Sequence, residues 1–441
     1  MARIALEKGN KKLLNAWAFY DWANSVYSLV IASAVFPIFY GALFRVAEIE
    51  KVTLFGGEIA RGPLISYVTS AAFLFIAIIT PLLSGIADYL GNKKVFMQFF
   101  CYLGALSSIG LYWFSLDNLM VSLGCYFFGL VGFWVSLAFN NSYLPDIAYT
   151  EQQDGISAKA YSIGYLGSVL LLLVNLTMVM KPDLFGITSD DNGVAEIKAM
   201  KYSFVTVGIW WIAFSQYTFY YLPQGNKKEG EKQNVILNGF KELKLVWKQL
   251  GNQIKLKRYL IAFFVYSMAV QTVMLIATFF GEEEIAWGGD SERTTGLIVS
   301  ILVIQLVAIL GATLTAKASK KFGNINTLVV VNILWVCICI YAYFVITPTD
   351  FYIAASFVGV VMGGIQALSR STYSKFLPDT KDTTSFFSFF DVAEKIGIVI
   401  GTFLYGFVAQ VTGSMRNAVI FLGIFFLVGV FLLFRAKKVG A

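Results

Sequence analysis

Four polar residues lie on one face of the first long apolar run of this chain. They follow one another at i, i+3, i+4 and i+7, the spacing that stacks side chains along one side of a helix: Asp21, Asn24, Ser25 and Ser28. A charge within an apolar run is costly and marks a candidate site for binding a solute or an ion. The alternative is that Asp21 only bonds neighbouring helices for packing.

A second group of charges lies in a late apolar run. Asp391, Glu394 and Lys395 stand at i, i+3 and i+4, and Asp391 can pair with Lys395 along a helix. That pairing leaves Glu394 as a spare acid, which we interpret as a candidate for reversible protonation. The same three residues could instead form a gate near one end of the helix, and both interpretations stay open.

Other apolar runs add single polar groups to the candidate site. Three are amides and one is a guanidinium: Asn140, Gln271, Gln366 and Arg370. The guanidinium could clamp a carboxylate of a bound solute, or it could anchor the end of its helix. The run with Gln271 aligns with the first run but has Val265 where the first has Asp21. This asymmetry favours a role for Asp21 in ion coupling.

The residue types present limit the chemistry. The chain has no His, which excludes a histidine proton relay, a Ser-His pair and a zinc-protease helix. Its four Cys lie in apolar runs without zinc-ligand spacing. An intramembrane aspartyl protease would need a second buried Asp after Gly-x-Gly, and Asp290 follows its glycines in a loop. We therefore expect no enzyme, no metal and no cofactor, and any proton coupling through carboxylates such as Asp21, Asp391 or Glu394.

Composition identifies the solvent of most of the chain as lipid. Of 441 residues, 57% are hydrophobic and only 14% are charged, whereas soluble domains carry about 25% charged residues. Twelve runs are long enough to cross a bilayer as helices, which takes about 20 residues. These runs are 16–43, 64–87, 95–116, 119–141, 161–180, 202–222, 258–280, 295–316, 326–346, 351–371, 385–410 and 416–435. The predicted fold is an all-α membrane protein of twelve transmembrane helices in two pseudo-symmetric six-helix halves.

Lys and Arg gather on one side of this arrangement. The side of both termini carries 25 of the 34, the opposite side carries eight, and Lys395 lies within a span. Cytoplasmic loops show such an excess, so we expect both termini in the cytoplasm of a bacterium and the chain in its inner membrane. The net charge of +7 therefore reflects orientation, and no nucleic-acid partner is expected.

The longest connection divides six spans from six. We expect an N-terminal half over 1–222, a cytoplasmic linker over 223–257 and a C-terminal half over 258–441. The linker has apolar residues at helical spacing: Ile236, Phe240, Leu243, Trp247 and Leu250. Basic residues flank that face: Lys241, Lys244 and Lys248. This pattern predicts an amphipathic helix lying on the inner membrane surface.

The two halves also share a motif. Asn140-Asn-Ser-Tyr-Leu-Pro-Asp146 in one half corresponds to Thr372-Tyr-Ser-Lys-Phe-Leu-Pro-Asp379 in the other. Related halves in a bilayer leave a natural site between them, and transporters alternate access to such a site by moving the halves. The repeat therefore favours transport over catalysis.

Two further motifs carry a resemblance to a known family. The connection Gly85-Ile-Ala-Asp88-Tyr-Leu-Gly91-Asn-Lys93-Lys94 is similar to the loop signature of the major facilitator superfamily. The segment from Trp17 to Tyr27, together with Gln366-Ala-Leu-Ser-Arg370, resembles the branch of the yeast vacuolar amino-acid effluxers and their bacterial relatives. The resemblance implies that the loop residues Gly85, Asp88, Gly91, Lys93 and Lys94 gate the cytoplasmic side. In that role, Asp88 would meet the N-terminus of the eleventh helix, whose dipole favours an anion.

The expected function is secondary active transport of a small polar solute by a monomer. The resemblance implies an amino acid as the solute, and the membrane carboxylates favour a proton over sodium as the coupling ion. A lipid or lysolipid flippase on the same fold and a membrane receptor that transports nothing remain alternatives.

Overall fold

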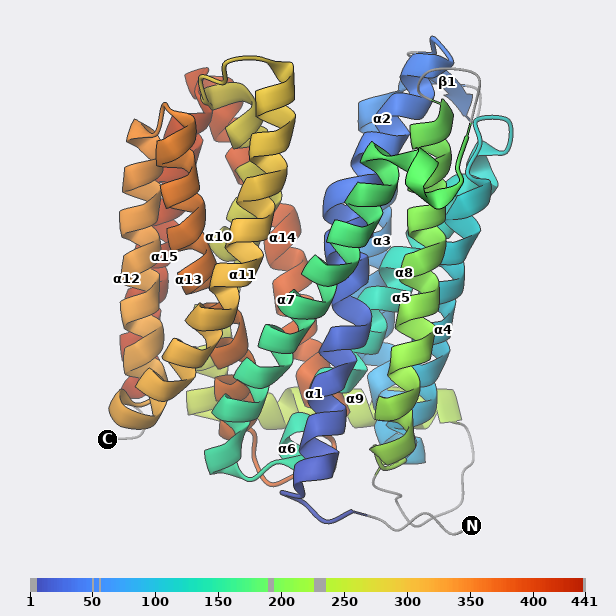
Figure 1. Ribbon diagram of the computed structural model, residues 1–441. Coiled ribbons are helices and arrows are strands. Elements are labelled where there is room, and N and C mark those ends of the chain that lie inside the picture. Colours follow the sequence, from blue (N-terminus) through green and yellow to red (C-terminus); the bar gives the residue numbers. More distant parts are fainter. Residues whose placement is uncertain (1–5, 50, 55–56, 189–193, 226–234, 439–441) are drawn as a thin grey trace.

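The computed structural model describes residues 6–49, 51–54, 57–188, 194–225 and 235–438, and most of them are helical. Long helices run side by side from the end with both termini, here called the termini side, to the opposite side (Figure 1). The first half of the chain forms α1 (Lys11–Val26), α2 (Phe36–Val46), α3 (Arg61–Leu90), α4 (Lys93–Gly110), α5 (Leu119–Asn141), α6 (Leu144–Ile147), α7 (Thr150–Met180) and α8 (Val194–Tyr221). The second half forms α10 (Ile254–Glu284), α11 (Asp290–Phe322), α12 (Asn324–Phe344), α13 (Pro348–Phe376), α14 (Thr383–Thr412) and α15 (Met415–Lys437).

All twelve predicted spans are helical. The first is one rod in which a π-helical stretch, Tyr27–Val35, joins α1 to α2. Among the described residues, eleven helical segments are long and apolar enough to cross a membrane. The sixth predicted span, 202–222 in α8, is not among the eleven, because its aromatic and polar residues lower its hydropathy. Short connections include the antiparallel strands β1 (Lys51–Leu54) and β2 (Gly57–Ala60), which pair Lys51 with Ala60.

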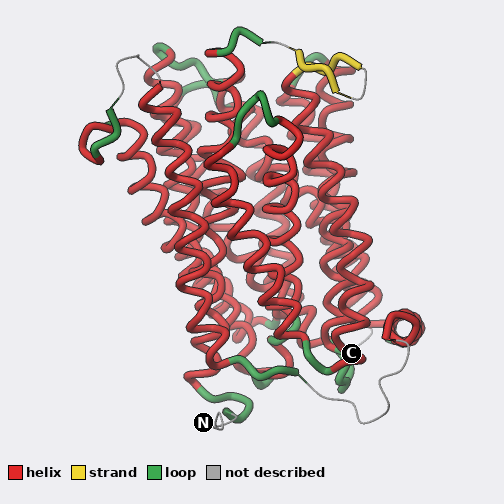
Figure 2. The backbone as a smooth tube through the Cα atoms, turned by 90° about the vertical axis from the view of Figure 1, so that its right-hand side faces the viewer, coloured by secondary structure: helices red, strands yellow, loops and turns green. Residues whose placement is uncertain are grey.

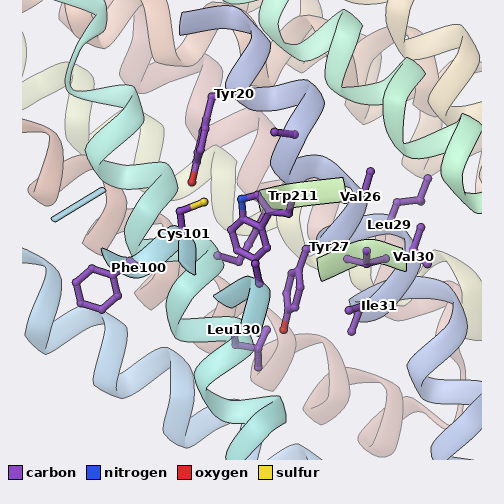
Figure 3. Close-up of a cluster of buried hydrophobic side chains, with 14 of the residues drawn as sticks. Tyr20, Val26, Tyr27, Leu29, Val30, Ile31, Phe100, Cys101, Leu130 and Trp211 are labelled. Atoms are coloured by element: carbon purple, nitrogen blue, oxygen red, sulfur yellow. The ribbon is translucent and has the colours of Figure 1, made fainter. Parts of the chain in front are cut away.

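Each half has its own apolar core. In the first half, Tyr20 of α1 and Tyr27 of the π-helical stretch point toward Trp211 of α8 and Cys101 of α4 (Figure 3), and all four are buried. In the second half, Trp335 of α12 stacks on a Phe of α15 with ring centroids 5.2 Å apart. Between the halves, α3 packs on α14, and α7 packs on α11 and α13.

The contact between α11 and α13 is close enough to exclude a side chain at Gly311, whose Cα faces the Val360 carbonyl. Replacing Gly311 with leucine is expected to lower the free energy of unfolding by about 1–3 kcal/mol, the usual cost of overpacking. The matched control is Gly406→Leu in α14, where no atom lies in the way of a side chain. Unfolding of both variants in detergent checks the prediction, and equal loss of stability would contradict it.

The linker forms helix α9 (Val235–Asn252). It lies crosswise at the termini side (Figure 1) and appears end-on beside the bundle in the perpendicular view (Figure 2). Its apolar residues do not share one environment, in contrast to the single membrane-facing side that the sequence predicts. Leu250 is buried in the core of the second half, whereas Phe240 and Trp247 are exposed. The side chain of Ile236 lies outside the described residues.

Candidate functional site

The central feature of the site is an ion pair between the halves. Arg370 of α13 donates from Nη1 and Nη2 to Asp21 Oδ2 of α1, at 3.2 and 3.3 Å. Their side chains are only 1% and 5% exposed. Removing one member of such a pair leaves the other charge buried and unpaired, which costs free energy. The two residues therefore form one functional unit. Arg370 therefore joins the halves and does not anchor its helix end at the bilayer surface.

Further groups from the first half hold the guanidinium in place. It donates to Asn141 Oδ1 at 3.0 Å and to the hydroxyl and carbonyl oxygens of Ser157 at 3.0 and 3.1 Å. Its carbon lies 4.8 Å from the ring centre of Trp17 and 4.3 Å from that of Tyr161. Arginine suits this setting because its planar guanidinium group donates hydrogen bonds to several partners and stacks on aromatic faces. The result is a rigid link between α13 and the helices α1, α5 and α7.

Several polar groups of the predicted first-half site are buried without a hydrogen-bond partner among the described residues. They are Asp21 Oδ1, Asn24 Nδ2 and both side-chain polar atoms of Asn140. Such groups cost free energy unless a solute, an ion or water satisfies them. The other two predicted residues of the stripe, Ser25 and Ser28, are half-buried. Ser25 lies against the backbone of Gly164 in α7.

The second half brings together the predicted charges of α14. Lys395 Nζ lies 3.1 Å from Asp391 and 2.5 Å from Glu394. The predicted pair of Asp391 and Lys395 is confirmed, but the prediction of Glu394 as a spare acid is wrong. Glu394 also accepts a hydrogen bond of 2.8 Å from Gln271 of α10. Lys395 stands 3.6 Å from the ring centre of Trp134 in α5, so this cluster also touches the first half.

A pocket adjoins both groups of charges, because its lining includes Tyr161, which contacts Arg370, and Glu394, which contacts Lys395. Its lining includes Tyr161 from the first half and Gln271, Gln366 and Glu394 from the second. Gln366 accepts a hydrogen bond of 2.6 Å from Tyr165 Oη across the interface. The structure therefore places polar groups of both halves and the carboxylate of Glu394 around one small space.

The predicted gating loop lies at the termini side. Asp88 at the end of α3 accepts a hydrogen bond of 2.7 Å from the backbone N–H of Ser385, in the first turn of α14. This is the predicted contact between Asp88 and the N-terminus of the eleventh span. Gly91 ends α3 with φ 62°, and Lys94 donates to the Leu222 carbonyl at 2.7 Å.

Lys93 of the same loop forms a separate link between the halves. It is 2.5 Å from Asp146 and donates to Thr383 of the second half at 3.0 Å. Its ammonium also stands 4.2 Å from the ring centre of Tyr143. The loop thus holds the first half and the start of α14 together. Gly85 packs on α9.

A further inter-half cluster was not predicted. Asp154 of α7 lies 2.6 Å from Lys375 of α13 and accepts hydrogen bonds from Ser319 of α11 and Asn324 of α12, at 2.8 and 2.9 Å. Asp154 is 3% exposed. It therefore connects one helix of the first half to three helices of the second half, close to the termini side.

The other residues missed by the sequence interpretation fall into two kinds. Asn141 and Trp17 belong to motifs that had been singled out, so their neighbours Asn140 and Asp21 could have led to them. Tyr161 and Trp134 stand among other aromatic residues without a local signal. Only their places in the fold bring them to Arg370 and Lys395.

The architecture matches that of solved transporters of the major facilitator superfamily. FucP in its outward conformation aligns with a TM-score of 0.70 at 16% identity, covering 96% of this chain and 98% of that one. The proton:xylose symporter XylE aligns with a TM-score of 0.70 at 12% identity, covering 96% and 95%. This likeness shows the fold class, an integral, multi-pass membrane protein with the architecture of these transporters.

Sequence relatives narrow this class. Residues 9–438 match the family described as "Vacuole effluxer Atg22 like", and the chain belongs to this family. An uncharacterized MFS-type transporter of Bacillus subtilis, YxiO, is 30% identical over 95% of this chain and 93% of its own length. Autophagy-related protein 22 of Kluyveromyces lactis is 22% identical, over 95% of this chain and 92% of its own.

Proposed function

We propose that this protein is a secondary active transporter that moves a small polar solute of the amino-acid class with proton coupling. In this proposal the halves 1–222 and 258–441 rock about the site between them, with 223–257 as their linker. The observation that carries the proposal is the buried pair of Asp21 and Arg370, because it joins the halves at the candidate site.

The charges around the site support the solute class. An amino acid presents a carboxylate and an ammonium group a short distance apart. Arg370 and Lys395 can meet the carboxylate, and Asp21 and Glu394 can meet the ammonium group. A solute that competes for the pair of Asp21 and Arg370 would loosen the contact between the halves. Binding and movement would then be coupled through the same groups.

Carboxylates support the choice of a proton as the coupling ion. Asp21, Asp391 and Glu394 are acids within the helices, and the chain has no His. A proton taken up by Asp21 would weaken its attraction to Arg370 and allow the halves to part. The excess of Lys and Arg on the termini side supports a cytoplasmic location for that side, so the described state would be closed toward the cytoplasm.

Proton flux in proteoliposomes tests the proposal. An internal pH dye would report proton movement as each of a panel of amino acids is added. We expect solute-dependent movement that is lost in Asp21→Asn and strongly reduced in Glu394→Gln. Asp183→Asn, an exposed carboxylate away from the site, is the matched control and should behave as the unchanged protein.

Two results would count against this proposal. If both Asp21→Asn and Glu394→Gln leave gradient-driven transport unchanged, the assigned site is wrong. If folded protein moves no protons with any amino acid, the solute class or the ion is wrong, and lipids and sodium-coupled solutes become the next candidates.

A further inference from the structure

Helix α9 touches both halves of the protein at the place where they meet. At one end, Gly239 packs against Gly85 and Ile86 of α3, so closely that a side chain at either glycine would clash with backbone or Ile86. Asn238 donates to Tyr89 Oη of α3 at 3.0 Å. This end of α9 therefore rests on the first half.

The other end rests on the second half. Val246 and Leu250 are buried in its apolar core, and the ring of Trp247 lies 5.2 Å from that of Phe389 in α14. Because α3 and α14 also pack on each other, α9 spans the seam between them. If that seam opened at the termini side, α9 would have to leave one of its two supports.

The rest of the α9 surface is divided by chemistry. At 100° per residue, Gly239, Val246 and Leu250 define the side toward the bundle. Phe240 and Trp247 lie roughly 90° away, and they are 50% and 63% exposed. The opposite flank carries polar groups such as Gln249. Leu245 toward that flank and Leu237 on the outer side are also exposed, at 54% and 61%, so only the aromatic part of the exposed apolar surface is confined to one flank.

Basic residues occupy the side that faces away from the bundle. They are Lys241, Lys244 and Lys248, and all are exposed. An apolar edge next to a basic side fits the boundary of a bilayer, where acyl chains meet anionic headgroups. The perpendicular view places α9 beside the bundle near the level of its helix ends (Figure 2), where such a boundary lies. No soluble partner is required to explain this division.

We propose that α9 is an anionic-lipid sensor that straps the seam of α3 and α14 closed. Anionic headgroups hold its lysine side and acyl chains hold Phe240 and Trp247, which keeps the helix seated on both halves. The proposal rests on the alternating access argued above. A ligand shifts an equilibrium between two states only if it binds them with different affinities. Here the ligand is the anionic lipid, and the two states have the seam of α3 and α14 closed or open. Only in the closed state can α9 contact both halves and the bilayer at once.

Spin-label distances in nanodiscs test this. Labels at Glu151→Cys in α7 and Lys320→Cys in α11, in full-length protein without its native Cys, would report opening at the termini side. We expect nanodiscs with phosphatidylglycerol to reduce the long-distance population relative to pure phosphatidylcholine, by on the order of tenfold in the ratio of states. The double variant Lys244→Glu/Lys248→Glu should lose this lipid dependence. Lys11→Glu/Lys12→Glu, the same charge change at exposed sites near the N-terminus, should keep it.

A polarity-sensitive dye at Gly251→Cys, where no atom blocks a side chain, would report whether α9 meets the bilayer. A dye that moves to a less polar setting with phosphatidylglycerol supports the proposal, and one that stays in water in both lipids overturns it in favour of a soluble partner. If two distance populations are present but their ratio does not depend on lipid charge, the strap alone is overturned. A single population under all conditions, with solute added, would overturn alternating access as well.

Discussion

Replacing Arg370 with glutamine is expected to abolish transport and to lower the free energy of unfolding by about 3–5 kcal/mol. Glutamine cannot neutralise Asp21, which then remains buried without its partner, and this is the costly way to break a buried ion pair. The variant also removes the donors to Asn141 and Ser157. Solute uptake in proteoliposomes and denaturant unfolding in detergent measure the two effects.

The double variant Asp21→Asn/Arg370→Gln measures the interaction within the pair apart from the contacts that each residue makes with its surroundings. We expect it to be more stable than Arg370→Gln alone, because no charge is left buried, while transport stays absent. The difference between the double and the summed single effects gives the coupling between the residues. Arg370→Lys keeps the charge but loses the planar fork, so intermediate stability is expected. Additive effects of the single changes would contradict a direct pair.

Replacing Asp154 with alanine is expected to open the termini side. Asp154 alone connects α7 to Lys375, Ser319 and Asn324, and its loss removes these links together. An impermeant maleimide can detect the opening at Ala158→Cys, a position buried among small residues of both halves. We expect labelling to become at least about tenfold faster. The reason is that losing hydrogen bonds to a charged group shifts the equilibrium toward the open form by more than about a factor of ten.

Two controls accompany that measurement. Asp183→Ala removes an exposed carboxylate far from the seam and should leave the labelling rate unchanged. A cysteine at Gly155, which is already exposed, should be labelled at one rate in every background. If Ala158→Cys reacts at the same rate with and without Asp154, the cluster does not hold the halves together.

The sequence predicted what depends on local pattern. Runs of apolar residues located all twelve helices, and the spacing of Asp21 and Asn24 placed them on one buried face. The family resemblance also predicted the partner of Asp88, and helix-end chemistry agrees, since a helix N-terminus favours an anion. The first two inferences need only neighbours along the chain, and the third also needs the family resemblance.

The missed contacts depend on helices far apart in the sequence. Arg370 meets Ser157 across 213 positions, and no pattern near either residue indicates the other. The error at Glu394 has a different cause. Adjacent side chains do not face each other on a helix, so Lys395 was paired with Asp391 alone. Its long side chain lies over Trp134, and there it reaches both acids.

The signs of the charges on the two sides of the contact between the halves have a consequence for how the molecule assembles. Asp21, Asp88 and Asp154 all come from the first half, and they are met by Arg370, Lys375 and the N-terminal turn of α14 from the second. Two copies of the first half would therefore leave Asp21 and Asp154 without Arg370 and Lys375, and unpaired buried acids disfavour that pairing. Although the halves share one architecture, each half should therefore pair with the other half in preference to a second copy of itself. Separately produced halves should consequently form one-to-one mixed complexes in a membrane.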